Sequence, residues 1–521
     1  MKRTEEINKI ENIRSEWDVI VVGGGATGLG VALESSVKGY KTLLLEQYDF
    51  AKSTSSKSTK LVHGGVRYLA QGYVDLVREA CKERGLFLQN APHLTQNVSF
   101  VIPLYSFFDI IMYTVGLKFY DLLAGKLSLG KSKYISKKET LKRLPTVKQA
   151  GLRGGILYHD GQFDDTRMAV NMAQTIVEHG GCVLNYAKVE NLLHDEKGQV
   201  NGVIFSDEIS GKTYNVHCKA VVNAAGVFAD SINSMDQKKE VKTIAPSQGI
   251  HLVLDNKFSP TDNAIMIPKT DDGRVLFVIP WHNKLVVGTT DTPVKEENIE
   301  PRALEQEIEF VLSTASRYLV GKPSRKDVLC VFAGLRPLAA NNKIDSTKTK
   351  EVSRSHKITV SNTRLFSIIG GKWTTYRKMG EDMVHTIEEK LKWEVLASKT
   401  QHLKIHGYSE KTDKNEALSI YGCDADAINA ISRTEENAQG WLSETLRISK
   451  AQLLWAIRNE MIEKVEDFLA RRTRALFLNV EESVLMAPEV ARIMAQQMGK
   501  DERWVENELN EYRELVKNYT C

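Results

Sequence analysis

Residues 18–46 begin with a short apolar run, pass through a glycine-rich turn into a helical pattern, and close with a second apolar run that ends in an acid. Short uninterrupted apolar runs bounded by turn residues predict buried strands. The segment therefore predicts a strand over residues 18–22, a helix after the glycines, and a second strand that ends at Glu46.

The glycines of this turn are Gly23, Gly25 and Gly28, in the spacing G-x-G-x-x-G. In a dinucleotide-binding unit the three positions serve a sharp turn, the close approach of a pyrophosphate, and tight packing of the helix on the strand. The helix directs its positive end toward the phosphates, and Glu46 can accept hydrogen bonds from ribose hydroxyls. We predict a dinucleotide site; a turn that only packs helix on strand is the alternative.

The later pattern predicts that the chain leaves this layer and returns to it. Residues 221–226 and 365–371 each resemble an apolar strand that meets small residues ahead of a helix. Strand-like runs between residues 241 and 360 predict a mixed sheet that interrupts the first domain. Beyond residue 401 the chain is charged and helix-forming, which predicts a separate helical domain. A cofactor held by segments so far apart favours FAD over a nicotinamide dinucleotide.

The most apolar segment is residues 105–123, where Asp109, Lys118 and Asp121 interrupt the run. These charges exclude a membrane span. By default we expect a helix buried in the second domain, because apolar helical faces usually pack into a core. An amphipathic helix that lies in a membrane interface is the alternative.

Composition narrows the class of protein. A chain of 521 residues is long enough for two or three domains. Its 70 Lys and Arg against 66 Asp and Glu give a formal net charge of +4, too balanced to favour nucleic acid as a partner. The six cysteines lie far apart and form no C-x-x-C pair, so we expect neither a metal site nor a disulfide framework. The charged N-terminus does not resemble a signal peptide, and a reducing, cytosolic setting fits best.

A hydroxyl-rich segment follows Glu46. Residues 53–59 carry serine or threonine at every position except Lys57, and they lead into a glycine pair followed by Arg67 and Tyr68. Small hydroxyl residues beside a glycine turn suit hydrogen bonding to phosphates and ring edges, whereas a flexible linker is the alternative. We favour binding, because a linker would not run directly into Gly64-Gly65.

Six motifs are specific in combination. They are GGGATGLG at 23–30, STSSKSTKLVHGGVRYL at 53–69, NAAGVFAD at 223–230, VIPWHNKLVVGTTD at 278–291, FAGLRPL at 332–338 and IIGGKWTTYRK at 368–378. Together they resemble the FAD-dependent glycerol-3-phosphate dehydrogenase family of the aerobic, respiratory type. The resemblance covers essentially the whole chain.

The resemblance implies an α/β fold: a glutathione-reductase-type FAD-binding domain, an interleaved mixed-sheet (α+β) substrate domain, and a C-terminal helical domain. We assign residues 17–105, 165–245 and 356–398 to the first, 106–164 and 246–355 to the second, and 401–521 to the third. The implied activity is oxidation of sn-glycerol 3-phosphate to dihydroxyacetone phosphate by hydride transfer to flavin N5, with electrons passed to a membrane quinone. We expect a cytoplasmic protein peripheral on the inner face of the cell membrane, and a homodimer is compatible with the family.

The resemblance also implies site residues. His251 matches the family's substrate-site histidine and is the candidate general base, while Arg67 and Tyr68 are placed to stabilise charge on the substrate oxygen. Arg336 and Arg354 match positions that the family uses for the substrate phosphate, with a surface salt bridge as the alternative for Arg354. Lys372 is assigned to substrate binding, and the flavin carbonyl is the alternative contact for its side chain. The expected cofactor-binding residues are Gly23, Gly25, Gly28, Glu46, Ser55, Ser56, Gly65, Ala225, Gly226, Gly371 and Thr374.

The chain departs from some relatives. Oxidase members of the family carry an inserted segment expected between Arg336 and Gly370, and this interval is short here, which favours the dehydrogenase. No calcium loop of the D-x-[DN]-x-[DN]-G type is present. The rival functions are a peroxide-forming glycerol-3-phosphate oxidase, a related flavin amine or hydroxy-acid oxidoreductase, and a non-catalytic flavin protein whose C-terminal helices recruit a partner.

Overall fold

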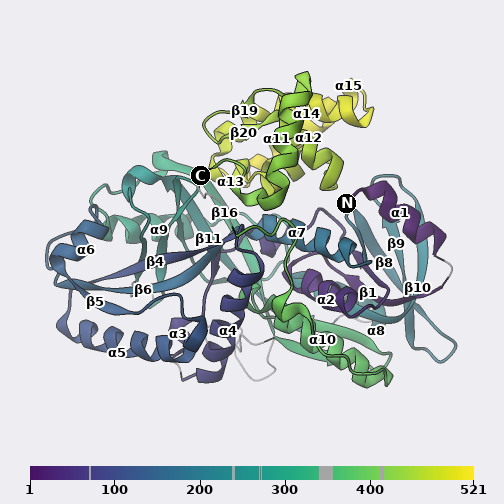
Figure 1. Cartoon of the computed structure of the whole chain (residues 1–521), viewed down its shortest axis with the longest axis horizontal. Helices are drawn as coiled ribbons and strands as arrows, with labels where there is room; N and C mark the ends of the chain where they lie inside the picture. The colour runs from purple at the N-terminus through teal and green to yellow at the C-terminus, as the bar shows by residue number, and fades with distance from the viewer. Residues whose placement is uncertain are drawn as a thin grey trace.

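The structure is a computed structural model. It describes residues 1–13, 15–69, 72–237, 241–268, 270, 273–339, 356–410 and 416–521, with residues 67 and 68 described at the level of the backbone. Two large sheets and a helical C-terminal domain make up the molecule (Figure 1).

The first sheet contains the glycine turn. Five parallel strands run side by side in the order β7 (Cys182–Leu184), β2 (Thr42–Leu45), β1 (Trp17–Val22), β10 (Thr213–Asn223) and β18 (Leu365–Ile369). Strand β17 (Lys357–Val360) pairs antiparallel with β18, and the hairpin of β8 (Ala187–His194) and β9 (Val200–Asp207) extends from β10. The two strands predicted to return to this layer are thus β10, which pairs with β1, and β18, which pairs with β10.

Three helices pack against this sheet: α2 (Ala26–Val37), α7 (Asp165–Glu178) and α10 (Tyr376–Leu391). Helices α2 and α10 approach closely because both have glycine at the crossing. A Cβ added to Gly30 would lie 2.5 Å from the Tyr376 carbonyl oxygen, and one added to Gly380 would lie 2.2 Å from the Gly30 oxygen. Smaller helices flank the domain: α1 (Arg3–Asn12) and α8 (Ala229–Gln237).

The second sheet is mixed and has ten strands. They are β3 (Leu61–Val62), β4 (Thr95–Leu104), β5 (Lys133–Ser136), β6 (Gly154–Phe163), β11 (Ile244–Asp255), β12 (Ala264–Ile267), β13 (Leu276–Trp281), β14 (Lys284–Gly288), β15 (Thr292–Pro293) and β16 (Val328–Ala339). Around it lie α3 (Val66–Leu69), α4 (Val74–Asn90), α5 (Phe107–Ala124), α6 (Lys137–Arg143) and α9 (Glu305–Tyr318). Strands β3 and β4 belong to this sheet although they fall within residues 17–105, which the sequence assigned to the first domain.

Helix α5 contradicts the default expectation of a buried helix. Only Leu117, Tyr120 and Ala124 are buried, at a helical spacing that gives one inward stripe. The opposite face exposes a row of large apolar side chains: Phe107, Phe108, Ile111, Met112, Val115, Phe119 and Leu122. Apolar side chains therefore lie on both faces of α5, but only the face with Leu117, Tyr120 and Ala124 packs against the rest of the protein. In the part of the chain that the structure describes, no helix has the length and apolar content needed to cross a bilayer.

The C-terminal domain is helical and caps the seam between the two sheets (Figure 1, yellow-green and yellow). Its helices are α11 (Ala425–Thr434), α12 (Lys450–Asn459), α13 (Ala475–Leu478), α14 (Val480–Met498) and α15 (Glu502–Val516), with a short hairpin of β19 (Trp441–Ser443) and β20 (Ile448–Ser449). Its core is shared with the second sheet, because Phe332 of β16 packs edge-on against Phe477 of α13 at 5.2 Å between ring centroids.

Candidate active site

A cavity of about 450 Å³ lies between the two sheets. Segments far apart in the chain line it, among them the glycine turn beside the first sheet and strands β11 and β16 of the second. The predicted site residues that line it are Gly23, Gly25, Glu46, Ser55, Gly65, Ala225, Gly226, His251, Arg336, Gly371, Lys372 and Thr374. The structure therefore brings most of the predicted residues to one place.

The glycine turn forms one wall of the cavity. Gly23 has φ +108°, and a Cβ there would lie 2.7 Å from the Ala224 carbonyl oxygen, so only glycine fits. Gly28 does not line the cavity: a Cβ at this position would lie 1.8 Å from the Gly23 oxygen, which makes its contribution one of packing the helix on the turn. Helix α2 begins beyond Gly25 and presents its N-terminus to the cavity.

Glu46 holds the glycine turn from the end of strand β2. One carboxylate oxygen accepts from the backbone N–H of Gly24 at 2.6 Å and the other from that of Tyr48 at 3.0 Å. Burial raises the pKa of Glu46, and the two backbone bonds oppose that rise. Each oxygen keeps a second lone pair that can accept from a ribose hydroxyl.

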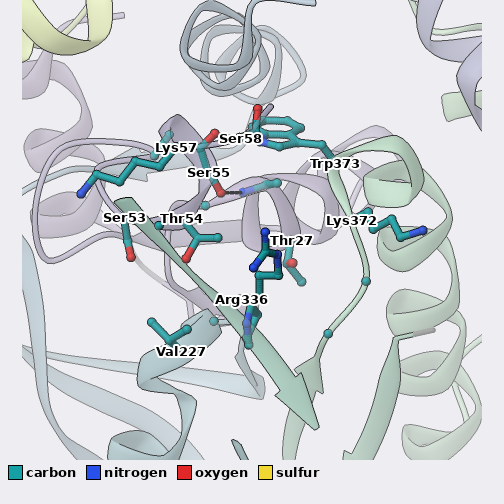
Figure 2. Close-up of a pocket in the computed structure, with 18 of the residues that line it drawn as sticks. Thr27, Ser53, Thr54, Ser55, Lys57, Ser58, Val227, Arg336, Lys372 and Trp373 are labelled. Atoms are coloured by element: carbon teal, nitrogen blue, oxygen red, sulfur yellow. Dashed lines mark hydrogen bonds between the residues drawn. The ribbon is translucent and has the colours of Figure 1, made fainter. Parts of the chain in front are cut away.

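The hydroxyl-rich segment lies against the glycine turn. The Ser55 hydroxyl accepts from the Ala26 backbone N–H at 2.9 Å (Figure 2), and the Ser55 carbonyl accepts from the Trp373 indole N–H at 2.8 Å. Ser56 lies outside the cavity lining and points back into its own turn, where its hydroxyl donates to the Ser53 carbonyl at 3.1 Å. The segment is thus a fixed wall and not a linker.

A buried polar network supports the loop that carries Gly65. The Gly64 backbone N–H donates to the Tyr120 hydroxyl at 2.8 Å, and Tyr120 and Arg84 both donate to Asp160. A Cβ at Gly64 would lie 2.3 Å from the sulfur of Cys81 on helix α4, so only glycine allows the loop to pack this closely against the helix. Helix α3 follows directly; the side chains of Arg67 and Tyr68, which the sequence assigned to charge stabilisation, lie outside the described part of the chain.

His251 lies on strand β11 and is 3% exposed. Its Nε2 shares a hydrogen bond of 2.9 Å with the Thr59 hydroxyl, and its ring stacks on Phe332 with 5.0 Å between centroids. Burial lowers the pKa of His251 well below its ordinary value, and the nearby Arg336 and Lys60 cations lower it further. The imidazole is therefore neutral at pH 7, the form that can accept a proton.

Arg336 reaches the cavity from strand β16. Its guanidinium donates to the Gln248 and Thr290 carbonyl oxygens at 3.3 and 3.0 Å, and it pairs with Asp291 at 3.4 Å. The guanidinium packs directly over Gly249, where a Cβ would lie 2.3 Å from an Arg336 nitrogen, so a larger residue would displace it. Figure 2 shows Arg336 between Thr54 and Lys372.

Lys372 comes from the strand-to-helix turn after β18. It precedes the short helix Trp373–Thr375, and the Thr374 hydroxyl accepts from the His63 backbone N–H at 3.2 Å. Gly371 has φ +77°, a backbone conformation that favours glycine. Arg354, the other predicted phosphate ligand, lies outside the described residues.

Sequence reasoning missed a buried ion pair under the site. Lys60 is fully buried and donates to both oxygens of Asp165, at 2.9 and 2.7 Å, while the Ser58 hydroxyl donates to the same carboxylate at 2.7 Å. The pair anchors the hydroxyl-rich segment to the start of α7. The only available signal was the Asp164-Asp165 pair that opens the helix, which indicates an N-cap and does not identify the partner.

The residues that line the cavity suit a bound dinucleotide. Near the glycine turn, the lining offers backbone N–H groups and open space, because a Cβ at Gly226 would meet nothing within 4 Å. Glu46 lines the cavity from the end of β2 in the first sheet, and His251 and Arg336 line it from β11 and β16 in the second. In the described part of the chain, no group of three or more His, Cys, Asp or Glu side chains could hold a metal ion.

Known proteins resemble the chain over most of its length. Residues 18–363 match a family model described as FAD dependent oxidoreductase, and residues 361–504 match one described as the C-terminal domain of alpha-glycerophosphate oxidase. The mitochondrial glycerol-3-phosphate dehydrogenase of Arabidopsis thaliana is 36% identical over 545 residues, which cover 96% of this chain and 86% of the relative. That of Bos taurus is 34% identical, covering 99% and 75%.

Solved structures of related flavoproteins share the fold of this chain. The glycerol-3-phosphate dehydrogenase of Bacillus halodurans, complexed with FAD, superposes with a TM-score of 0.80 at 29% identity and covers 99% of this chain and 97% of that one. The L-alpha-glycerophosphate oxidase of Mycoplasma pneumoniae, with FAD bound, shares the fold at a TM-score of 0.58 and 19% identity, over 74% of this chain and 97% of that one. The predicted fold class is confirmed. From the glycine cradle, the shared fold and the match along the whole chain, we conclude that this protein belongs to the FAD-dependent glycerol-3-phosphate dehydrogenase family.

Proposed function

We propose that the protein oxidises sn-glycerol 3-phosphate to dihydroxyacetone phosphate with FAD, and passes the electrons to a quinone at the inner face of the cell membrane. The observation that carries the proposal is that one cavity joins the glycine cradle to a neutral histidine and an arginine.

Each substrate-end residue has a chemical task in this proposal. When bound, FAD supplies the acceptor for the hydride that leaves the carbinol carbon. His251 accepts the hydroxyl proton at Nε2, the ring nitrogen that meets the cavity-lining hydroxyl of Thr59. Arg336 binds the substrate phosphate and orients the alcohol, because a guanidinium can contact two phosphate oxygens at once. Loss of hydride and proton leaves the ketone.

An anaerobic titration tests this function. Mixing the FAD-loaded protein with glycerol 3-phosphate without oxygen should bleach the flavin absorbance, and a soluble quinone analogue should restore it. The absence of bleaching would refute the proposed substrate. Recovery in air as fast as recovery with the quinone analogue would instead identify an oxidase.

The exposed face of α5 supports the membrane part of the proposal. Phe108 and Leu122 are 73% and 72% exposed, and a soluble surface seldom leaves so many large apolar side chains contiguous on one helix. Exposed lysines follow within a few residues, among them Lys126, Lys131 and Lys133. An apolar face with nearby cations suits the interface of an anionic bilayer.

Vesicle flotation separates this face from other exposed apolar residues. The double substitution F108E/L122E should abolish flotation with anionic vesicles, while leaving flavin bleaching by glycerol 3-phosphate unchanged. The matched control is Leu485→Glu, at a 75% exposed position on α14 of the C-terminal domain. Equal binding of F108E/L122E and the unsubstituted protein would show that α5 does not contact the membrane.

A further inference from the structure

The C-terminal domain contacts the nucleotide-binding domain through a buried row of charged side chains. The π-helical turn Asp467–Arg472 and the residues after it supply the cations, and the loop after β2 supplies the central carboxylate, Asp49. Asp49 is fully buried, and Arg471 and Arg472 are 3% and 0% exposed. A charged group so far from water is retained only when it is paired.

Two guanidinium groups hold the Asp49 carboxylate. Arg471 donates through Nε at 2.5 Å, and Arg472 donates through both terminal nitrogens at 2.6 and 2.9 Å. Burial alone raises the pKa of this carboxyl group, but Arg472 and Arg471 outweigh it and hold the pKa well below the ordinary range. The Asp49 carboxyl group is therefore ionised at neutral pH, and hydrogen bonds between charged groups are among the strongest in proteins.

Asp49 lies between residues that form the cavity wall. Glu46 and Tyr48 precede it and Ala51 and Lys52 follow it, and all four line the cavity. The Ala51 backbone N–H donates to the Gly24 carbonyl at 3.1 Å, so the loop is tied directly to the glycine turn. A displacement of Asp49 would thus move both Glu46 and the turn that it supports.

A second contact crosses the same seam. Lys52 donates to Glu466 at 2.5 Å, and Glu466 in turn accepts from Arg471 at 3.4 Å. Tyr186, in the loop before β8, donates to Asp467 at 2.7 Å. Side chains of the C-terminal domain therefore contact residues 46–52 on the side of this segment that faces away from the cavity.

We propose that Arg471 and Arg472 are positioning residues for the cofactor site, through which the C-terminal domain fixes the wall that receives the adenosine half of FAD. They act through Asp49 and touch neither cofactor nor substrate. The inference rests on the FAD site of the proposed function and not on its substrate, because FAD binding can be titrated alone.

Arg167 provides a matched control. It is also fully buried, and it also pairs with a carboxylate of the C-terminal domain, Glu460, at 2.8 and 2.9 Å. Arg472 contacts the same residue, with its Nε 3.7 Å from a Glu460 carboxylate oxygen and one terminal nitrogen donating to the Glu460 carbonyl at 2.7 Å. Arg167→Gln therefore disturbs the same charged network but leaves both arginines on Asp49 in place. Arg167 lies on α7, away from the cavity lining. Removing one partner of a buried ion pair strongly destabilises the fold in both variants. Comparing them therefore distinguishes a general loss of stability from a specific displacement of the cavity wall.

The test compares Arg472→Gln with Arg167→Gln by titrating the deflavinated proteins with FAD and following the quenching of flavin fluorescence. We expect Arg472→Gln to raise the Kd for FAD at least tenfold and to change the visible circular dichroism of the bound flavin. At saturating FAD its KM for glycerol 3-phosphate should stay within twofold. Arg167→Gln should lower Tm by a similar amount while leaving the Kd for FAD within twofold.

Equal losses of FAD affinity in the two variants, or an unchanged Kd in Arg472→Gln, would overturn the proposal. If Arg472→Gln yields no soluble protein, the milder Glu466→Gln decides, since its side chain is 10% exposed and it removes one seam contact. There we expect at least a threefold rise in Kd, and a value indistinguishable from that of the unsubstituted protein would refute the positioning role.

Discussion

Removing the guanidinium of Arg336 is the most direct test of the substrate end. In Arg336→Ala the cavity keeps His251 and the glycine cradle, because neither depends on the arginine for a hydrogen bond. The lost interaction is the one proposed with the substrate phosphate. We therefore expect a rise in KM for glycerol 3-phosphate and a smaller fall in kcat.

The structure limits the size of the effect. A hydrogen bond to a charged group contributes about 1.5–3 kcal/mol, but the two terminal nitrogens of Arg336 already face four acceptors: Gln248 O, Thr289 Oγ1, Thr290 O and Asp291 Oδ1. Phosphate must share or displace these bonds, so the lower part of that range applies. About 1.5–2 kcal/mol corresponds to a roughly 10- to 30-fold rise in KM, at about 1.4 kcal/mol per factor of ten.

Steady-state turnover with a dye acceptor measures KM, and inhibition by a phosphorylated acid that lacks an oxidisable alcohol measures binding alone. KM and the inhibition constant should rise by the same factor in Arg336→Ala. Arg302→Ala, at an exposed arginine of the same domain, should change neither. A KM for Arg336→Ala within threefold of that of the unsubstituted protein would refute the phosphate contact.

Two further substitutions probe the same end. His251→Gln should lower kcat by about 10²–10⁴, because it removes the proposed base. The pKa of His251 in the folded protein lies below the ordinary value near 6.5, so between these two pKa values the unfolded chain binds one more proton than the folded protein. The free energy of unfolding should therefore fall as the pH drops below about 6.5, and urea unfolding of the Gln variant should lose part of this acid sensitivity. Identical kcat and identical acid unfolding would contradict both statements. Gly249→Ala should raise KM without removing charge, because its Cβ would displace the flexible end of Arg336; a raised KM with an unchanged Tm is expected, and an unchanged KM would show that the guanidinium position does not matter.

The sequence predicted the strand, glycine turn and helix of the first sheet, because local backbone geometry determines them. The spacing of Gly23, Gly25 and Gly28 reports local steric demands, and a local pattern suffices to predict them. The acid at the end of the second strand follows from the same unit. Strands β10 and β18 were also placed correctly, since apolar runs that meet small residues indicate the same layer.

Other features depend on docking between distant segments, which no local pattern records. Helix α5 shows this, because its period predicts which side chains share a face but not whether anything covers that face. The pair between Lys60 and Asp165 and the clamp on Asp49 join residues more than 100 and more than 400 positions apart. Their charges were visible in the sequence, but their partners were not.

The two ends of the cavity are held by different parts of the molecule. Backbone groups, Glu46 and the C-terminal clamp hold the cofactor end, whereas strands β11 and β16 hold His251 and Arg336. Since β11 and β16 pair directly, with Ser247 opposite Arg336, the substrate end keeps its geometry when the seam at Asp49 is disturbed. Cofactor affinity and substrate KM are therefore separable: changes at the seam should move the first, and changes at Arg336 or Gly249 should move the second. A substitution at Asp49 that raised KM without weakening FAD binding would mean that the C-terminal domain acts on the substrate sheet through Phe332 and Phe477 instead.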